Sequence, residues 1–127
     1  MQNRIRSTRP TSASSVIPMP GRLSVAYRDW ASRTNRTVSI DQVPTNTVVT
    51  TTGTITAVVR LAGGRAMVVI TAGDGNSAHV LLNADTVRMT APALFAGYRM
   101  TVRGMVFRAP GGAPAGIDAG GVQIEVA

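Results

Sequence analysis

Cysteine and lysine are both absent from this 127-residue chain, and aromatic residues make up only 4% of it. Without cysteine, the chain can form neither disulfides nor thiolate metal sites. The scarcity of rings argues against a strong general single-strand binder, because such proteins stack bases on several aromatic side chains. No apolar run is long enough to cross a membrane, so we expect no membrane partner and no secretory signal.

Catalytic constellations are missing as well. His79 is the one histidine, the six carboxylates are scattered, and no serine stands in a Gly-x-Ser-x-Gly elbow. Asp74 and His79 alone are too few ligands to hold a metal. The glycine-rich stretches at 63–65, 73–76 and 109–112 lack the lysine of a phosphate-binding loop and are typical of turns. We therefore expect no enzyme activity, no cofactor and no metal site.

The chain is basic, with a formal net charge of +7. All 13 basic residues are arginines, whose planar guanidinium groups bind phosphate and stack on flat rings. The charge is uneven, because residues 1–46 carry a net +5 and residues 47–127 only +2. A basic chain favours nucleic acid or another polyanion as its partner.

Residues 1–21 show no periodic apolar pattern and contain three early arginines, Arg4, Arg6 and Arg9. This composition predicts a flexible basic arm that adds affinity for nucleic acid without sequence preference. An arginine- and serine-rich start without acidic residues is also typical of an organelle transit peptide. We expect a cytoplasmic protein of bacterial or phage origin; the alternative is an organelle protein targeted through the arm.

Residues 22–34 carry apolar side chains at the spacing of one helical face. These are Leu23, Ala26, Tyr27, Trp30 and Ala31. We expect a short amphipathic helix that packs on the rest of the protein, because so short a helix is unstable in water with its apolar face exposed. Tyr27 and Trp30 would anchor this helix; the alternative is that they stack on nucleobases. Residues 37–46 would link the helix to the first strand.

The remainder of the chain predicts an all-β fold. β-Branched residues are dense, and glycine-rich turns separate short apolar runs. Five strands are expected, at residues 47–61, 66–72, 77–82, 98–108 and 122–126. Gly53 and Gly104 would bend the first and fourth strands. Residues 83–96 predict a loop or short helix that plugs one end of a barrel, and residues 109–121 predict a long loop.

Segments 48–55, 67–75 and 94–106 resemble the OB-fold family of nucleic-acid-binding domains. The shared pattern begins with a valine-rich strand that has a glycine in its middle (VVTTTGTI). An apolar strand that ends in an Asp-Gly turn follows (MVVITAGDG), and then a leucine, a glycine and an alternating strand with its own glycine (LFAGYRMTVRGMV). The resemblance covers residues 47–127. It implies a closed five-stranded barrel that binds single-stranded DNA or RNA.

The expected architecture is an all-β, five-stranded OB-like closed β-barrel over residues 47–127. A short N-terminal amphipathic helix and linker over residues 22–46 would pack on it, preceded by the flexible arm of residues 1–21. Strand alternation sorts the barrel side chains by face. Those expected to point inward are Val68, Ile70, Ala78, Val80, Leu82, Met100, Val102 and Val106. Those expected to point outward are Met67, Val69, Thr71, His79, Leu81, Thr101, Arg103, Met105 and Phe107.

Ligands of OB domains lie across the second and third strands and between two connecting loops. Seven side chains on or near this surface are candidate nucleic-acid contacts. The arginines that would bind phosphates are Arg60, Arg65, Arg103 and Arg108. The rings on which bases would stack are His79, Tyr98 and Phe107.

Two functions stay open. The first is a non-catalytic, nucleic-acid-binding protein whose partner is single-stranded DNA or RNA. The second is a structural or interaction subunit of a virion, replication complex or ribonucleoprotein. It would dock on protein partners or on copies of itself through the arm and the outward Met67, Val69, Leu81 and Met105. A continuous arginine stripe on the folded protein would favour the first, and a neutral methionine- and valine-rich face the second.

Overall fold

The computed structural model describes residues 21–108 and 114–126, and strands dominate them. They are β1 (Ser24–Asp29), β2 (Thr34–Ser39), β3 (Val48–Arg60), β4 (Ala66–Thr71), β5 (Ser77–Leu82), β6 (Arg99–Arg108) and β7 (Ala115–Glu125). One α-helix, α1 (Ala84–Thr90), and short 3-10 turns at Ile40–Gln42, Ala62–Gly64 and Ala91–Ala93 complete the described part. The all-β prediction is confirmed, whereas the predicted arm with Arg4, Arg6 and Arg9 lies outside the described residues.

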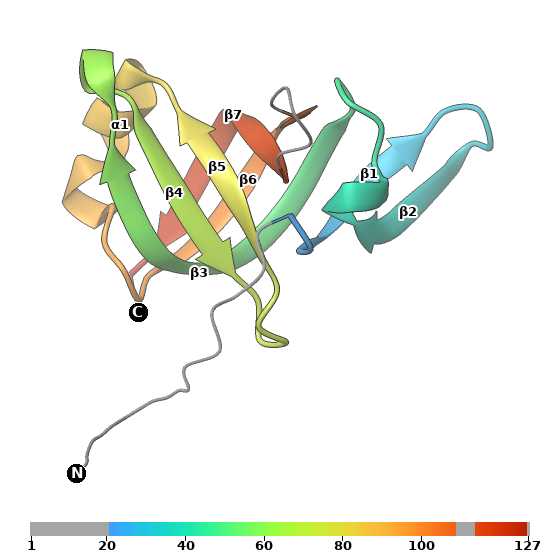
Figure 1. Ribbon diagram of the computed structural model, residues 1–127, viewed down its shortest axis with the longest axis horizontal. Helices are drawn as coiled ribbons and strands as arrows, with labels where there is room; N and C mark the ends of the chain where they lie inside the picture. Colours follow the sequence, from blue (N-terminus) through green and yellow to red (C-terminus); the bar gives the residue numbers. More distant parts are fainter. Residues whose placement is uncertain (1–20, 109–113, 127) are drawn as a thin grey trace, which may run out of the picture.

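Five of the strands close into a barrel (Figure 1). Hydrogen-bonded neighbours run in the order β3–β4–β5–β7–β6, and β6 returns to β3. All these pairs are antiparallel except β5–β7, which is parallel. β3 pairs with β6 as far as Thr54 and with β4 from Thr54 onward, so one long strand serves both walls. Gly53 lies at this change of partner, as predicted, and a side chain there would press on Ile70 and Thr71.

The interior of the barrel follows the predicted alternation. All eight residues expected to point inward are buried, and all nine expected to point outward are exposed or half-buried. α1 covers one end of the barrel, where Val87 and the following Leu94 are buried. The side chain of Asn83 caps this helix by accepting a hydrogen bond from the backbone N–H of Thr86 (2.8 Å). The predicted plug is therefore a helix.

β7 is longer than the sequence predicts. The loop expected over residues 109–121 is wrong from Ala115 onward, where the chain already pairs with β6. Ala115 and Ile117 are buried, and a β-carbon on Gly116 would stand only 2.7 Å from the Phe107 ring. Gly116 is therefore required by close packing in the barrel wall and does not mark a turn.

The N-terminal helix predicted over residues 22–34 is wrong. These residues form β1 and the turn after it, and β1 pairs along its whole length with β2. The buried Leu23 and Val25 alternate with exposed neighbours, as in a strand. Tyr27 packs against the core, but Trp30 in the turn is 78% exposed. Pairing with a second strand has overridden the helical spacing of the apolar residues.

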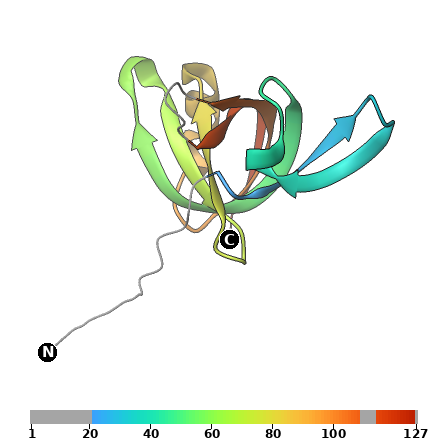
Figure 2. The ribbon, with the colours of Figure 1, turned by 45° about the vertical axis from the view of Figure 1, so that its right-hand side comes forward.

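β1 and β2 form a hairpin that projects from one side of the barrel (Figure 2). A bridge between Ala26 and Thr50 joins β1 to β3, which extends the barrel sheet into the hairpin. Leu23 and Ile40 at the base of the hairpin belong to the barrel core. The linker predicted over residues 37–46 is shorter than expected, because β2 continues to Ser39.

Candidate nucleic-acid interface

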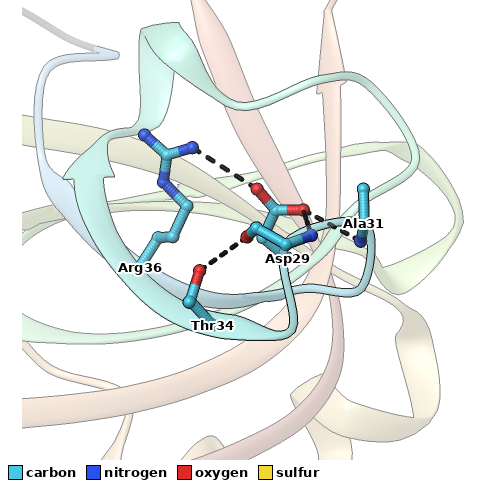
Figure 3. Close-up of polar contacts among 5 residues, drawn as sticks. Asp29, Ala31, Thr34 and Arg36 are labelled. Carbon is cyan, nitrogen blue, oxygen red and sulfur yellow. Dashed lines mark hydrogen bonds and ion pairs between the residues drawn. The ribbon is translucent and has the colours of Figure 1, made fainter.

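The turn between β1 and β2 is built around the carboxylate of Asp29 (Figure 3). Its Oδ1 accepts hydrogen bonds from the backbone N–H groups of Ala31 (3.1 Å) and Ser32 (3.3 Å). Its Oδ2 pairs with the guanidinium of Arg36 at 3.4 Å. The hydrogen bond from the Ser32 N–H is the main reason that the pKa of Asp29 lies below its ordinary value. Asp29 is therefore charged at neutral pH and holds the turn closed.

Trp30 sits in this turn with most of its ring in solvent. The guanidinium carbon of Arg28 lies 5.3 Å from the centroid of the ring, which is cation–π geometry. The same guanidinium donates a hydrogen bond to the side-chain oxygen of Asn35 (3.4 Å), its cross-strand partner. Arg28 is thus held beside Trp30 on one face of the hairpin, whereas Arg36 pairs with Tyr27 and lies on the other face.

A groove of about 370 Å³ separates the hairpin from the barrel, and we call it the hairpin groove. It is lined by residues 26–28 and Trp30 of the hairpin, by residues 46–48 and Thr50, and by Arg103 of β6. Among the described residues, no acidic side chain lines it. Two cationic side chains and an exposed ring therefore meet around an uncharged floor.

Arg103 is the predicted phosphate contact that the fold brings to this groove. It is exposed, and its row across the sheet consists of small residues: Ala26, Thr50 and Gly121. Arg103 also lines two adjoining hollows, of about 470 and 390 Å³, on the outer surface of β6 and β7. Among the described residues that line these two hollows, Asp118 in the second is the acidic one. A ligand in the hairpin groove can thus continue along β6.

Arg60 and Arg65 lie elsewhere, at the turn between β3 and β4. Arg60 is the last residue of β3 and follows Thr50, the partner of Arg103, by ten residues. This separation corresponds to about 30 Å along the strand. The Arg65 Nε donates a hydrogen bond to the carbonyl oxygen of Ala62 (3.1 Å) within the turn. The four predicted arginines therefore do not form one stripe.

The guanidinium of Arg108, the fourth predicted phosphate contact, already donates hydrogen bonds to other groups of the protein. Its Nη1 donates to Thr45 Oγ1 (3.1 Å). Its Nη2 donates to the carbonyl oxygens of Asp41 and Val43, both at 2.8 Å. Arg108 therefore fastens the segment between the hairpin and β3 to the end of β6.

The three predicted stacking rings do not share a surface. His79 and Phe107 are neighbours on the outer wall, because both pair with Gly116. Tyr98 instead packs against the core and meets Phe95 edge to face, with 6.2 Å between ring centroids. The outward side chains of β4 and β5 around His79 carry no charged group; they are Met67, Val69, Thr71 and Leu81.

Trp30 is the interface residue that the sequence analysis placed wrongly, because the helical spacing put it on a buried face. Arg28 is exposed, as the same spacing implies, but it was not among the predicted contacts. Only the first strand of the hairpin carries a signal in the sequence, because Leu23, Val25 and Tyr27 alternate with other residues before the turn, whereas residues 34–39 after it are mostly polar.

Comparisons with known proteins assign no family to the chain: no family model matches it, and a search of curated proteins found no match.

Within residues 21–108 and 114–126, no three histidine or acidic side chains gather closely enough to hold a metal ion. None of the helices in this part of the chain is long and apolar enough to cross a membrane.

Proposed function

We propose that this protein is a non-catalytic, OB-type protein that binds single-stranded nucleic acid along the hairpin groove and the adjoining outer surface of β6. The observation that carries the proposal is the meeting of Arg28, Arg103 and the exposed Trp30 around a groove without acidic groups. Guanidinium groups bind phosphate oxygens in a bidentate manner, and aromatic rings stack on bases. These are the two interactions on which sequence-tolerant single-strand binding depends.

The architecture supports the OB type. The long bent β3, the α-helix between β5 and β6 and the closure through β7 correspond to the arrangement that the family resemblance implies. The proposed surface differs from the usual one across the second and third barrel strands. Here those strands are β4 and β5, whose outward side chains offer no cation to a phosphate.

Fluorescence anisotropy with labelled single-stranded DNA and RNA tests the proposal, using two charge-matched double variants. R28A/R103A removes both groove arginines, and R60A/R65A removes two arginines at the far turn. We expect binding that weakens with salt, and we expect R28A/R103A to lower the salt slope by about 1.4 and R60A/R65A to leave it close to wild type. Equal losses in the two variants, or no binding at low salt, would contradict the proposal.

A second candidate function is that of an interaction subunit, favoured by the uncharged outer wall of β4 and β5. Met67, Val69 and Leu81 are only half-buried there. Met105 on β6 is 46% exposed, but Asp118 of β7 lies between it and Leu81. Contiguous exposed apolar surface is typical of protein interfaces. Size-exclusion chromatography with light scattering checks self-association: we expect an oligomer that Leu81→Glu converts to a monomer. A monomeric wild-type chain argues against this candidate.

A further inference from the structure

Trp30 is the only tryptophan of the chain, and its exposure has no explanation in packing. A tryptophan buries more apolar surface than any other side chain, so leaving it 78% in solvent forgoes a large gain in stability. The neighbouring Tyr27 is packed against the core, so burial of a ring at the hairpin is feasible. Tryptophan is enriched at interfaces, so an exposed tryptophan beside a groove lined by two arginines points to a ligand contact.

The turn holds the Trp30 backbone in a defined conformation. Asp29 accepts hydrogen bonds from the two N–H groups that follow Trp30, and the hydroxyl groups of Ser32 and Thr34 lie 2.6 Å apart (Figure 3). Arg33 adopts a left-handed conformation (φ 58°), which completes the reversal of the chain. A ring carried on an ordered turn loses little conformational entropy when a ligand stacks on it.

Arg28 occupies one side of the Trp30 ring and leaves the rest open. The guanidinium lies 5.3 Å from the ring centroid and is held by Asn35. Arg28, Trp30 and Arg103 all line the hairpin groove. A nucleic-acid backbone whose phosphates contact the two arginines therefore passes within reach of the open part of the ring.

We infer that the hairpin tip is a stacking site for one unpaired nucleobase, which lies on the open face of Trp30 with Arg28 on the opposite face. This inference rests on the proposed function and names the part of the ligand that the site recognises. The base must be unpaired, because both faces of a base inside a duplex are covered by its neighbours. Every base has a π-face, so the site tolerates any sequence and discriminates single strands from duplexes.

The experiment uses the full chain and three ligands of equal length, about 12 nucleotides, which lies within the site sizes of OB folds. They are a single-stranded DNA, the same strand with abasic residues throughout, and the duplex. Anisotropy of a label on the DNA measures binding, and the intrinsic fluorescence of Trp30 measures stacking without interference from another tryptophan. We expect the single strand to quench Trp30, and the abasic strand to bind through its phosphates without quenching. The duplex is expected to leave the emission unchanged.

Trp30→Ala supplies the matching variant, with Phe95→Ala as a control that removes another exposed ring away from the groove. Because both side chains are largely exposed, both variants are expected to fold, which far-UV circular dichroism checks. We expect Trp30→Ala to weaken single-strand binding by about 5- to 150-fold, and Phe95→Ala to have little effect. Wild-type binding by anisotropy with unchanged Trp30 emission, together with an unaltered Kd for Trp30→Ala, overturns the stacking site and leaves the proposed function in place. No anisotropy change with any ligand overturns both.

Discussion

The barrel and the hairpin are held together by different means. The barrel closes around fully buried side chains such as Ile70, Val80 and Ile117, and each of its strands pairs on both sides. Beyond its base, the hairpin relies on the pairing of β1 with β2, one bridge to β3 and the hydrogen bonds of its turn. Stability therefore comes mainly from the barrel interior, whereas the proposed binding surface lies on the outside of both regions, and substitutions can affect the two separately.

The largest effect is expected from a cavity in the barrel. Ile70 has no exposed surface, so Ile70→Ala should lower the free energy of unfolding by about 2–5 kcal/mol. Urea denaturation followed by circular dichroism measures the loss. Met89→Ala is the control, because Met89 is 82% exposed and its removal should change the free energy by less than about 0.5 kcal/mol. Similar losses in the two variants would show that the barrel interior is not the main source of stability.

Arg108→Ala sharpens the comparison, because Arg108 joins the two regions. Its removal leaves the carbonyl oxygen of the buried Val43 without this donor, which should cost about 1–3 kcal/mol of stability. The affinity for single strands, measured where the variant is fully folded, should stay close to wild type, because Arg108 lies outside the proposed interface. A large loss of affinity without a loss of stability would restore Arg108 as a phosphate contact.

Substitutions at Asp29 change the hairpin tip without touching the barrel. Asp29→Ala removes the acceptor for the Ala31 and Ser32 N–H groups, so we expect single-strand affinity to fall by about two- to tenfold. Asp29→Asn keeps a side-chain oxygen at that place and should retain most of the affinity and of the Trp30 quenching. Anisotropy and emission report both quantities. If Asp29→Asn behaves like Asp29→Ala, the negative charge rather than the turn geometry is what matters.

The smallest effect is expected from acidification. The Ser32 hydrogen bond keeps the pKa of Asp29 below its ordinary value of 3.8 in the folded chain. A carboxyl whose pKa is lowered by folding contributes its full stabilisation above the unfolded value and loses it as the pH falls through the folded value. Any change in Trp30 emission that reports protonation of Asp29 should therefore have its midpoint below pH 3.8. Asp29→Asn should lack this change, with circular dichroism separating it from unfolding of the barrel. A midpoint between neutral pH and 3.8 that Asp29→Asn removes would contradict the lowered pKa of Asp29.

The barrel was predictable because its strands carry a strong local signal. Buried and outward residues alternate along β4 and β5, with Val68, Ile70, Val80 and Leu82 among the buried ones. Alternation with a period of two is characteristic of a β-strand. β7 escaped prediction in its first half, because its glycines and alanines have the same composition as a loop, although Gly116 is packed against Phe107. Only the neighbouring strand distinguishes a tightly packed glycine from a turning one.

The hairpin was not predictable to the same degree. Leu23, Tyr27 and Trp30 fit a helical face, whereas Leu23, Val25 and Tyr27 fit a strand, and a segment this short satisfies both patterns. The partner strand β2 is mostly exposed and polar, so it lacks the apolar alternation that would have identified it. Of the candidate site, Arg103 was predicted, but its grouping with Arg28 and Trp30 depends on how the hairpin leaves the barrel.

Chemical-shift mapping by NMR tests most directly whether single-stranded nucleic acid binds along the hairpin groove and β6, because it compares all surfaces of the protein in one titration. A single-stranded oligonucleotide is titrated into the ¹⁵N-labelled chain, and the backbone amides and the Trp30 indole N–H are followed. The account predicts that the largest shifts fall on Trp30 and on Ala26, Thr50, Arg103 and Gly121, the row that runs from the hairpin groove into the adjoining hollow. Shifts confined to Val69, His79 and Leu81 on the wall of β4 and β5 would contradict it.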